Sequence, residues 1–225
     1  MPTRITKEFL IGVLLLLLPG CRGYINWGGC PWHHRSEAVR QIEEGRRFAQ
    51  STAVFARYSA RIVFDALPLA DQVRVAYTRM VAGRYGKSKK WLETELAKQV
   101  ACNKKRVRFY VLALRELPFG DQCGQWVPQL SVDGAIYKPL YIQHVDPSVE
   151  YKHILGPRYT RFKIIYEIAF PGYDGEGQPV VPSTARSVAL IFESYDKKAI
   201  MSWDVGADGV TFGDEKSIAS NQKER

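Results

Sequence analysis

The spacing of hydrophobic positions changes near Asn103, and this change divides the chain into two parts. Between Glu37 and Phe64, small and apolar residues recur at intervals of three, four or seven, a spacing that predicts a long helix. A second helix is expected over residues 69–81, and Ser88 is a candidate N-cap for a third. The first part is therefore predicted to be an α-helical bundle or hairpin.

After Asn103 the apolar positions alternate with period two, as from Val107 to Leu114, which predicts a β-strand. Asp133-Gly134 is a strong hairpin-turn signal. Further strands are predicted at residues 126–132, 136–145, 160–170, 186–194 and 199–205, with no helix between them. The expected fold class is α+β, an N-terminal helical bundle or hairpin followed by an antiparallel immunoglobulin-like β-sandwich.

The first twenty residues have the pattern of a secretory signal. Arg4 and Lys7 form a basic start, and an apolar run follows from Phe9 to Leu18. This run of about ten residues is too short to cross a hydrocarbon core of about 30 Å as a helix. A plain secretory signal and an uncleaved anchor remain alternatives to the interpretation that follows.

Leu18-Pro19-Gly20-Cys21 resembles the lipobox of bacterial lipoproteins, although Pro19 departs from the small or β-branched residue usual there. In that family the signal is cleaved before the cysteine, whose thiol carries a diacylglyceryl group and whose amino terminus is acylated, commonly with palmitate. The resemblance makes Cys21 the expected lipidation site. By similarity to enterobacterial sorting, Arg22 after the cysteine favours the outer membrane over the inner membrane.

The rest of the chain resembles a group of uncharacterised bacterial lipoproteins that pair a helical N-terminal region with a C-terminal β domain. The residues that carry this resemblance are Trp126, Leu130, Gly134, Pro139, Leu155, Pro157, Tyr166, Phe170 and Pro171. The group implies architecture and location but no activity. The expected organisation is a signal peptide (1–20), a lipidated tether (21–34), a helical region (35–103), a β-sandwich domain (104–214) and a disordered tail (215–225).

Charge is distributed unevenly along the chain. Residues 33–105 carry 15 Lys/Arg and 7 Asp/Glu, whereas residues 106–214 carry 11 and 13. The basic part is typical of a well-solvated helical surface, and the alternative is contact with anionic lipid headgroups through residues that include Arg46, Arg47, Lys87, Lys89 and Lys90. Nucleic acid is a poor partner for an exported lipoprotein.

The remaining cysteines are Cys30, Cys102 and Cys123, and an oxidising compartment favours one disulfide among them. Cys102 and Cys123 are a possible pair, because they would close a loop of about twenty residues, but Cys30 could pair with either. With His33 and His34, Cys30 also forms a Cys-x-x-His-His cluster that contains ligands suited to zinc or copper. A flexible tether with exposed histidines is the simpler interpretation, so we expect no metal or other cofactor.

Two acidic patterns have simple structural explanations. Asp204, Asp208, Gly209 and Glu215 match part of a calcium loop, but Gly206 stands where a ligand is required, so a hairpin turn is expected. The carboxylates of Asp174, Glu176, Glu167 and Glu150 are expected to be solvated at the surface.

The predicted function is that of a lipid-anchored cell-envelope protein without catalysis, because no nucleophile elbow or acid/base pair occurs in the sequence. Its expected partners are the membrane, reached through lipidated Cys21, and another envelope protein or polymer. The alternative is a metal-binding or hydrolytic envelope enzyme that uses Cys30, His33 and His34.

Overall fold

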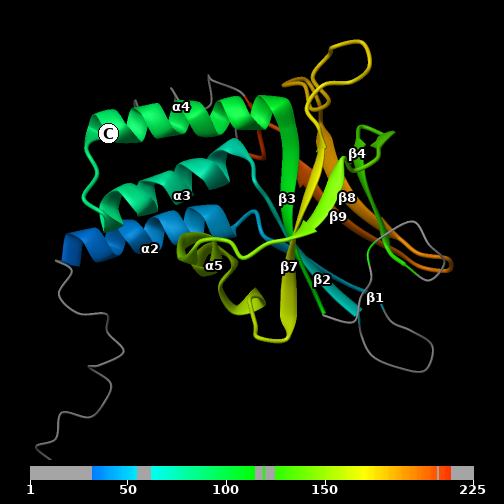
Figure 1. Ribbon diagram of the computed structural model, residues 1–225, viewed down its shortest axis with the longest axis horizontal. Helices are drawn as coiled ribbons and strands as arrows, with labels where there is room; N and C mark the ends of the chain where they lie inside the picture. The colour runs from blue at the N-terminus through cyan, green and yellow to red at the C-terminus, as the bar shows by residue number, and fades with distance from the viewer. Residues whose placement is uncertain (1–31, 55–61, 115–118, 120–124, 207, 214–225) are drawn as a thin grey trace, which may run out of the picture. The chain divides into compact units, whose positions relative to one another are not determined.

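The computed structural model describes the backbone of residues 32–54, 62–114, 119, 125–206 and 208–213, and the side chains from residue 37 onward except that of Ile62 (Figure 1). From Ala38 onward, the described residues belong to one compact unit with its own hydrophobic core.

The described helices are α2 (Trp32–Arg46), α3 (Asp71–Arg84), α4 (Lys89–Lys105) and α5 (Val149–Leu155), with a 3₁₀ turn η2 (Gly156–Arg158). The described strands are β1 (Gln50–Val54), β2 (Ile62–Pro68), β3 (Arg106–Leu114), β4 (Val127–Val132), β5 (Ala135–Tyr137), β6 (Tyr141–His144), β7 (Lys163–Pro171), β8 (Ser187–Glu193) and β9 (Lys198–Asp204). They form two antiparallel sheets with strand orders β1-β2-β3-β7-β6 and β5-β4-β8-β9. The predicted α+β class with antiparallel sheets is confirmed, and its immunoglobulin-like form stays a prediction.

Aromatic side chains join the two sheets. Phe64 of β2 stacks on Phe192 of β8 with ring centroids 4.4 Å apart, and its ring edge meets Trp126 beside β4 at 5.1 Å. Phe109 of β3 lies 5.5 Å from Trp203 of β9. These side chains are at most 5% exposed, so the main core lies between the facing sheets.

The other face of the five-stranded sheet is covered by helices, which gather on one side of the strands (Figure 1). The Tyr110 ring of β3 meets the Tyr151 ring of α5 edge-on at 5.2 Å, and Tyr151 stacks on Tyr77 of α3 at 4.2 Å. Successive strand residues point to opposite faces, so Tyr110 faces the helices whereas Phe109 faces the second sheet. The five-stranded sheet is therefore the middle layer.

The predicted helix from Glu37 to Phe64 is wrong beyond Arg46, and the helix begins at Trp32 rather than Glu37. Strands β1 and β2 occupy the second half of the predicted range, and Ser51 pairs with Asp65 across them. β2 in turn pairs with β3, which puts residues from the predicted helical region and the predicted β domain in one sheet. The regular spacing of alanines indicates a helix, but pairing with a distant strand gives this segment an extended backbone instead.

Two predictions for the β half are also wrong. The expected single strand at 136–145 is divided at Pro139 into β5 and β6, which belong to different sheets. Helix α5 interrupts the expected all-strand region, and its seven residues are too few to show a helical period clearly.

Two local predictions are confirmed. The Ser88 hydroxyl accepts a hydrogen bond from the Trp91 N–H at the start of α4. Asp133-Gly134 forms the β4–β5 turn, with φ angles of 47° and 95°.

Candidate functional site

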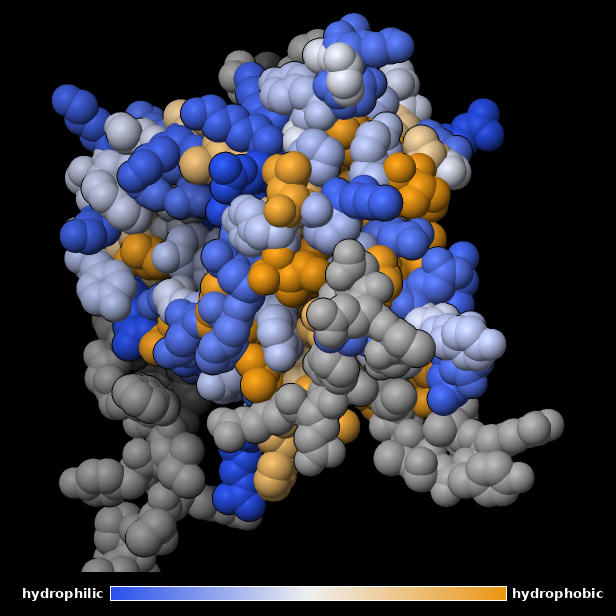
Figure 2. Space-filling model, turned by 45° about the vertical axis from the view of Figure 1, so that its right-hand side comes forward, coloured by the Kyte–Doolittle hydropathy of each residue, from blue (hydrophilic) through white to orange (hydrophobic). Residues whose placement is uncertain are grey.

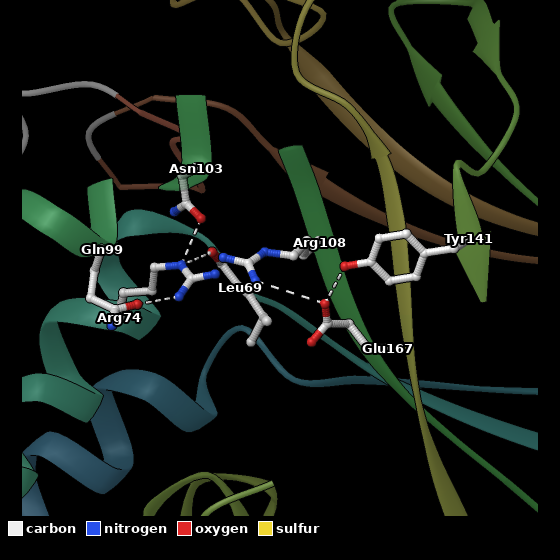
Figure 3. A network of polar contacts seen from close by, with 7 residues as sticks. All are labelled: Leu69, Arg74, Gln99, Asn103, Arg108, Tyr141 and Glu167. Atoms are coloured by element: carbon white, nitrogen blue, oxygen red, sulfur yellow. Dashed lines mark hydrogen bonds and ion pairs between the residues drawn. The ribbon is translucent and has the colours of Figure 1, made fainter. Parts of the chain in front are cut away.

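A buried polar layer lies between the helices and the five-stranded sheet (Figure 3). Its first centre is Arg74 of α3, which is only 4% exposed. The Arg74 Nε donates to the Leu69 carbonyl at 3.0 Å and to the Asn103 Oδ1 at 2.6 Å, and Nη1 donates to the Gln99 Oε1. Arg74 thus joins α3 to two residues of α4, because its planar guanidinium reaches several acceptors at once.

Asn103 links Arg74 to a carboxylate. Asn103 donates from Nδ2 to the Asp71 Oδ1 at 2.8 Å. The Thr211 hydroxyl donates to the other Asp71 oxygen at 3.2 Å, and the Asp71 N–H donates to the Thr211 carbonyl. This network therefore joins both helices to the C-terminal end of the described chain.

The second centre of the layer lies where β3, β6 and β7 meet. Tyr141 of β6 donates its hydroxyl proton to the Glu167 Oε1 at 2.6 Å. The Arg108 Nη1 of β3 lies 3.7 Å from the same oxygen. Burial and the bond to Glu167 raise the pKa of Tyr141, so this hydroxyl stays protonated as a donor. The Glu167 carboxylate is therefore held between a cation and a phenol.

Two tyrosines of the layer are affected by both arginines. Burial raises the pKa of Tyr110, and it raises the pKa of Tyr151 to about 12. The positive charges of Arg74 and Arg108 lower the pKa of both tyrosines and so oppose both shifts. Both tyrosines remain neutral hydrogen-bonding groups at physiological pH.

The layer has spare hydrogen-bond donors. The Arg74 Nη2 and the Arg108 Nε are buried and have no hydrogen-bond acceptor among the residues that the structure describes. Such N–H groups are suited to an ordered water molecule or to the oxygen of an anion. The hydrogen bonds of Arg74 to α4 and of Glu167 to Tyr141 indicate a structural role for the layer as a whole.

Two further buried carboxylates are paired with basic side chains. Asp65 of β2 accepts from the Lys163 Nζ and from the Ser51 hydroxyl, the latter at 2.5 Å. Glu150 of α5 accepts from the Arg84 Nη1 at 2.9 Å. The predicted surface solvation is therefore wrong for Glu150 and Glu167, which are 5% and 9% exposed. Folding places a cation beside each of them, a long-range effect that local sequence does not reveal.

The predicted lipidation and thiol residues are covered only in part. Cys21, Cys30 and Cys123 lie outside the described residues. Cys102 is exposed near the end of α4 and forms no disulfide within the described residues, and its pairing with Cys123 stays a prediction because Cys123 lies outside them. His33 and His34 fall in the first turn of α2, but their side chains are not described.

The two acidic loops have ordinary turn contacts. The Asp174 carboxylate accepts from the Glu176 and Gln178 N–H groups at 2.9 and 2.8 Å, and both acidic residues are at or near the surface. Asp204 ends β9 and Gly209 lies in the turn that follows, whereas Glu215 is outside the described residues. Within the described residues, no group of three or more His, Cys, Asp or Glu side chains is placed to hold a metal ion.

Sequence reasoning missed Arg74 and Arg108 as organising residues. A signal for Arg108 was present, because it interrupts the strongly apolar strand Val107–Leu114. Arg74 gave no comparable signal, since a basic residue in a surface helix is ordinary. Comparisons of the chain with protein-family models, curated proteins and solved structures found no match.

Proposed function

We propose that this chain is a lipid-anchored protein of the bacterial cell envelope that binds another envelope protein or polymer and does not catalyse a reaction. The observation that carries the proposal is the series of a basic start, a short apolar run and Cys21 after Gly20. The lipid holds the protein on a membrane. Arg22 after the cysteine favours the outer membrane over the inner membrane. Among the described helices, none combines the length and apolarity needed to cross a bilayer.

The arrangement of buried charges supports binding over acid/base chemistry. Glu150, Glu167 and Asp65 each have a basic neighbour within ion-pair distance, so each carboxylate is engaged in a contact that links parts of the fold. An immunoglobulin-like relation of the two sheets is part of the proposal. It is supported by their antiparallel pairing and by the aromatic contacts between them.

Two edge strands offer a surface for a protein partner. β5 and β6 are the outer strands of their sheets and follow each other in sequence. Ile136 is 52% exposed and Leu140 is 56% exposed beside these edges. The view turned toward the strand side shows apolar side chains at the surface among polar ones (Figure 2). An open edge with exposed apolar side chains favours a protein partner.

The anchor is tested by the intact mass of the native protein after detergent extraction. We expect residues 21–225 plus a diacylglyceryl group and one acyl chain, and recovery in the outer-membrane fraction. The Cys21→Ser variant is the control, and it should lack the lipid mass and leave the membrane fraction. An unmodified full-length mass in the native protein would refute the anchor. Comparing the mass before and after reduction also shows whether the protein contains a disulfide.

The binding role is tested by a photocrosslinking residue placed at Leu140 in living cells. We expect one dominant crosslinked product, which disappears when Ile136 is changed to Asp. The same residue placed at Lys98, whose side chain is 71% exposed on α4, is the control and should not give that product. If Leu140 and Lys98 give the same products, the edge is not a binding surface.

A further inference from the structure

The turn between α3 and α4 is densely basic. We define the basic turn as residues Arg84–Trp91, which contain Arg84, Tyr85, Lys87, Lys89, Lys90 and Trp91. All residues from Arg84 to Lys90 are exposed, and Trp91 is half-buried. Cations and large aromatic side chains therefore share one short projecting segment.

The three lysines of the basic turn are not neutralised by the fold. Within the described residues, no carboxylate lies within ion-pair distance of Lys87, Lys89 or Lys90, whereas Arg84 is paired with Glu150. Lys89 and Lys90 also occupy the first turn of α4, which contains no acidic residue. Cations at a helix N-terminus are unfavourable because they face the positive end of the helix dipole. Folding alone thus gives no reason for this placement.

The aromatic side chains give the turn a second property. Tyr85 is 59% exposed, with the Arg84 Cζ lying 5.6 Å from its ring centroid. The Lys87 Nζ lies 5.8 Å from the Trp91 ring centroid. Tyrosine and tryptophan are enriched at the headgroup level of bilayers, where an apolar ring and a polar tip are both accommodated. An aromatic pair among free lysines therefore suits a lipid surface better than a fully hydrated polyanion.

The other basic residues considered from the sequence have contacts within the fold. Arg46 donates from Nη2 to the His153 carbonyl at 2.9 Å and from Nε to the Ile154 carbonyl at 3.3 Å, near the end of α5. The Arg47 guanidinium lies 4.6 Å from the Phe48 ring centroid. Arg46 is therefore held by main-chain carbonyls, whereas no described carboxylate lies within ion-pair distance of the three lysines of the basic turn.

We infer that the basic turn binds the headgroups of an anionic bilayer and so docks the folded unit on the membrane surface. The inference rests on the proposed lipid anchor, which would keep the protein at a membrane. In Figure 1, the turn between α3 and α4 lies at the end of the helices that is remote from the strands.

The experiment measures vesicle cosedimentation of the unlipidated chain that starts at Arg22. This form keeps the whole compact unit, which begins at Ala38. Vesicles of phosphatidylcholine with about 30% phosphatidylglycerol are compared with pure phosphatidylcholine, because surface lysines contribute to binding only where lipids are anionic. We expect binding to the anionic vesicles alone, weakened as salt rises from about 0.05 M to about 0.5 M.

Replacing Lys87, Lys89 and Lys90 together by Gln should lower the partition coefficient about a hundredfold, since each lysine near the surface contributes about fivefold. Replacing Tyr85 and Trp91 together by Ala should lower it severalfold at unchanged charge. The matched control replaces Lys138, Lys197 and Lys198 by Gln, removing the same charge at positions away from the helices. Circular dichroism verifies that all variants are folded.

Equal losses in the basic-turn and control variants would overturn the proposal, because net charge alone would then explain binding. Binding to heparin without binding to anionic vesicles would overturn it as well, as would equal binding to neutral vesicles. The unlipidated chain carries no acyl group, so these outcomes are independent of the mass measurement that tests the anchor. A missing lipid and a failure of the basic turn are thereby distinguished.

Discussion

Replacing Arg74 by Met tests whether the buried polar layer stabilises the fold. The substitution removes the donors to the Leu69 carbonyl, the Asn103 Oδ1 and the Gln99 Oε1. Methionine replaces most of the buried aliphatic part of the arginine side chain, but it leaves these three acceptors without the guanidinium donor. Arg74→Met should therefore loosen α3 from α4 without opening a large cavity.

The expected change in the free energy of unfolding follows from two opposing contributions. Hydrogen bonds from a charged donor contribute about 1.5–3 kcal/mol each, so three of them give about 5–9 kcal/mol as an upper bound. Removing the guanidinium also removes the desolvation cost of a buried cation, which is several kcal/mol. We expect a net loss of about 3 kcal/mol in the free energy of unfolding. For a chain of this size, that loss lowers the melting temperature by about 6–12 °C.

Urea and thermal unfolding of the chain from Arg22 onward measure this loss. Lys98→Met on the exposed face of α4 is the control, and it should change stability by less than about 0.5 kcal/mol. A double-mutant cycle with Asn103→Ala should give a coupling energy of about 1–2 kcal/mol, because the two side chains are in direct contact. A loss below about 1 kcal/mol without coupling would refute the stabilising role of Arg74.

Three further predictions concern titration and close packing. Because burial raises the pKa of Tyr151 from 10.0 to about 12, stability should fall as pH rises through this range, and Tyr151→Phe should reduce that fall in alkaline unfolding curves. Hydrogen bonds from the backbone N–H groups of Arg186 and Ser187 lower the pKa of Asp133 below its ordinary value of 3.8. The contribution of Asp133 to stability should therefore be present above pH 3.8 and be lost as the pH falls through the lowered pKa of the folded protein. A carboxyl NMR titration midpoint at or above 3.8 would contradict this. Gly172→Ala should lower the free energy of unfolding by about 1–3 kcal/mol, the usual cost of overpacking, because an added Cβ would lie 2.2 Å from a backbone oxygen. Gly175→Ala is the control, since its Cβ would enter open space, and this variant should unfold like the wild type.

Local patterns identified several elements because the deciding forces act within a few residues. The Ser88 hydroxyl caps the helix that follows it, and Asp133-Gly134 adopts the positive φ angles of a tight turn. The alternation from Val107 to Leu114 predicted β3 because each residue's face is set by its position in the strand. These features depend on residues that are close in sequence, so they can be predicted without knowledge of the tertiary structure.

The strand pairing of β1 and β2 could not be read in the same way. Their small residues suit a helix face as well as a strand, and the register that joins Asp65 to Leu112 depends on a strand more than forty residues away. The same holds for Glu167, whose neighbour Arg108 comes from β3 and whose hydrogen-bond donor Tyr141 comes from β6. Non-local pairing overrides local preference because it buries whole faces at once.

The sequence by itself determined the α+β class and the basic character of the first half, and the proposed secretory signal before Cys21 rests on it alone. Only the tertiary structure decided which charges are used inside the fold and which remain at its surface. Arg46 and Arg74 bind carbonyl and amide oxygens brought to them by folding, whereas Lys87 and its neighbours project from a turn. The formal charge of a side chain is set by the residue type, whereas the group that it contacts is set by the packing of the fold.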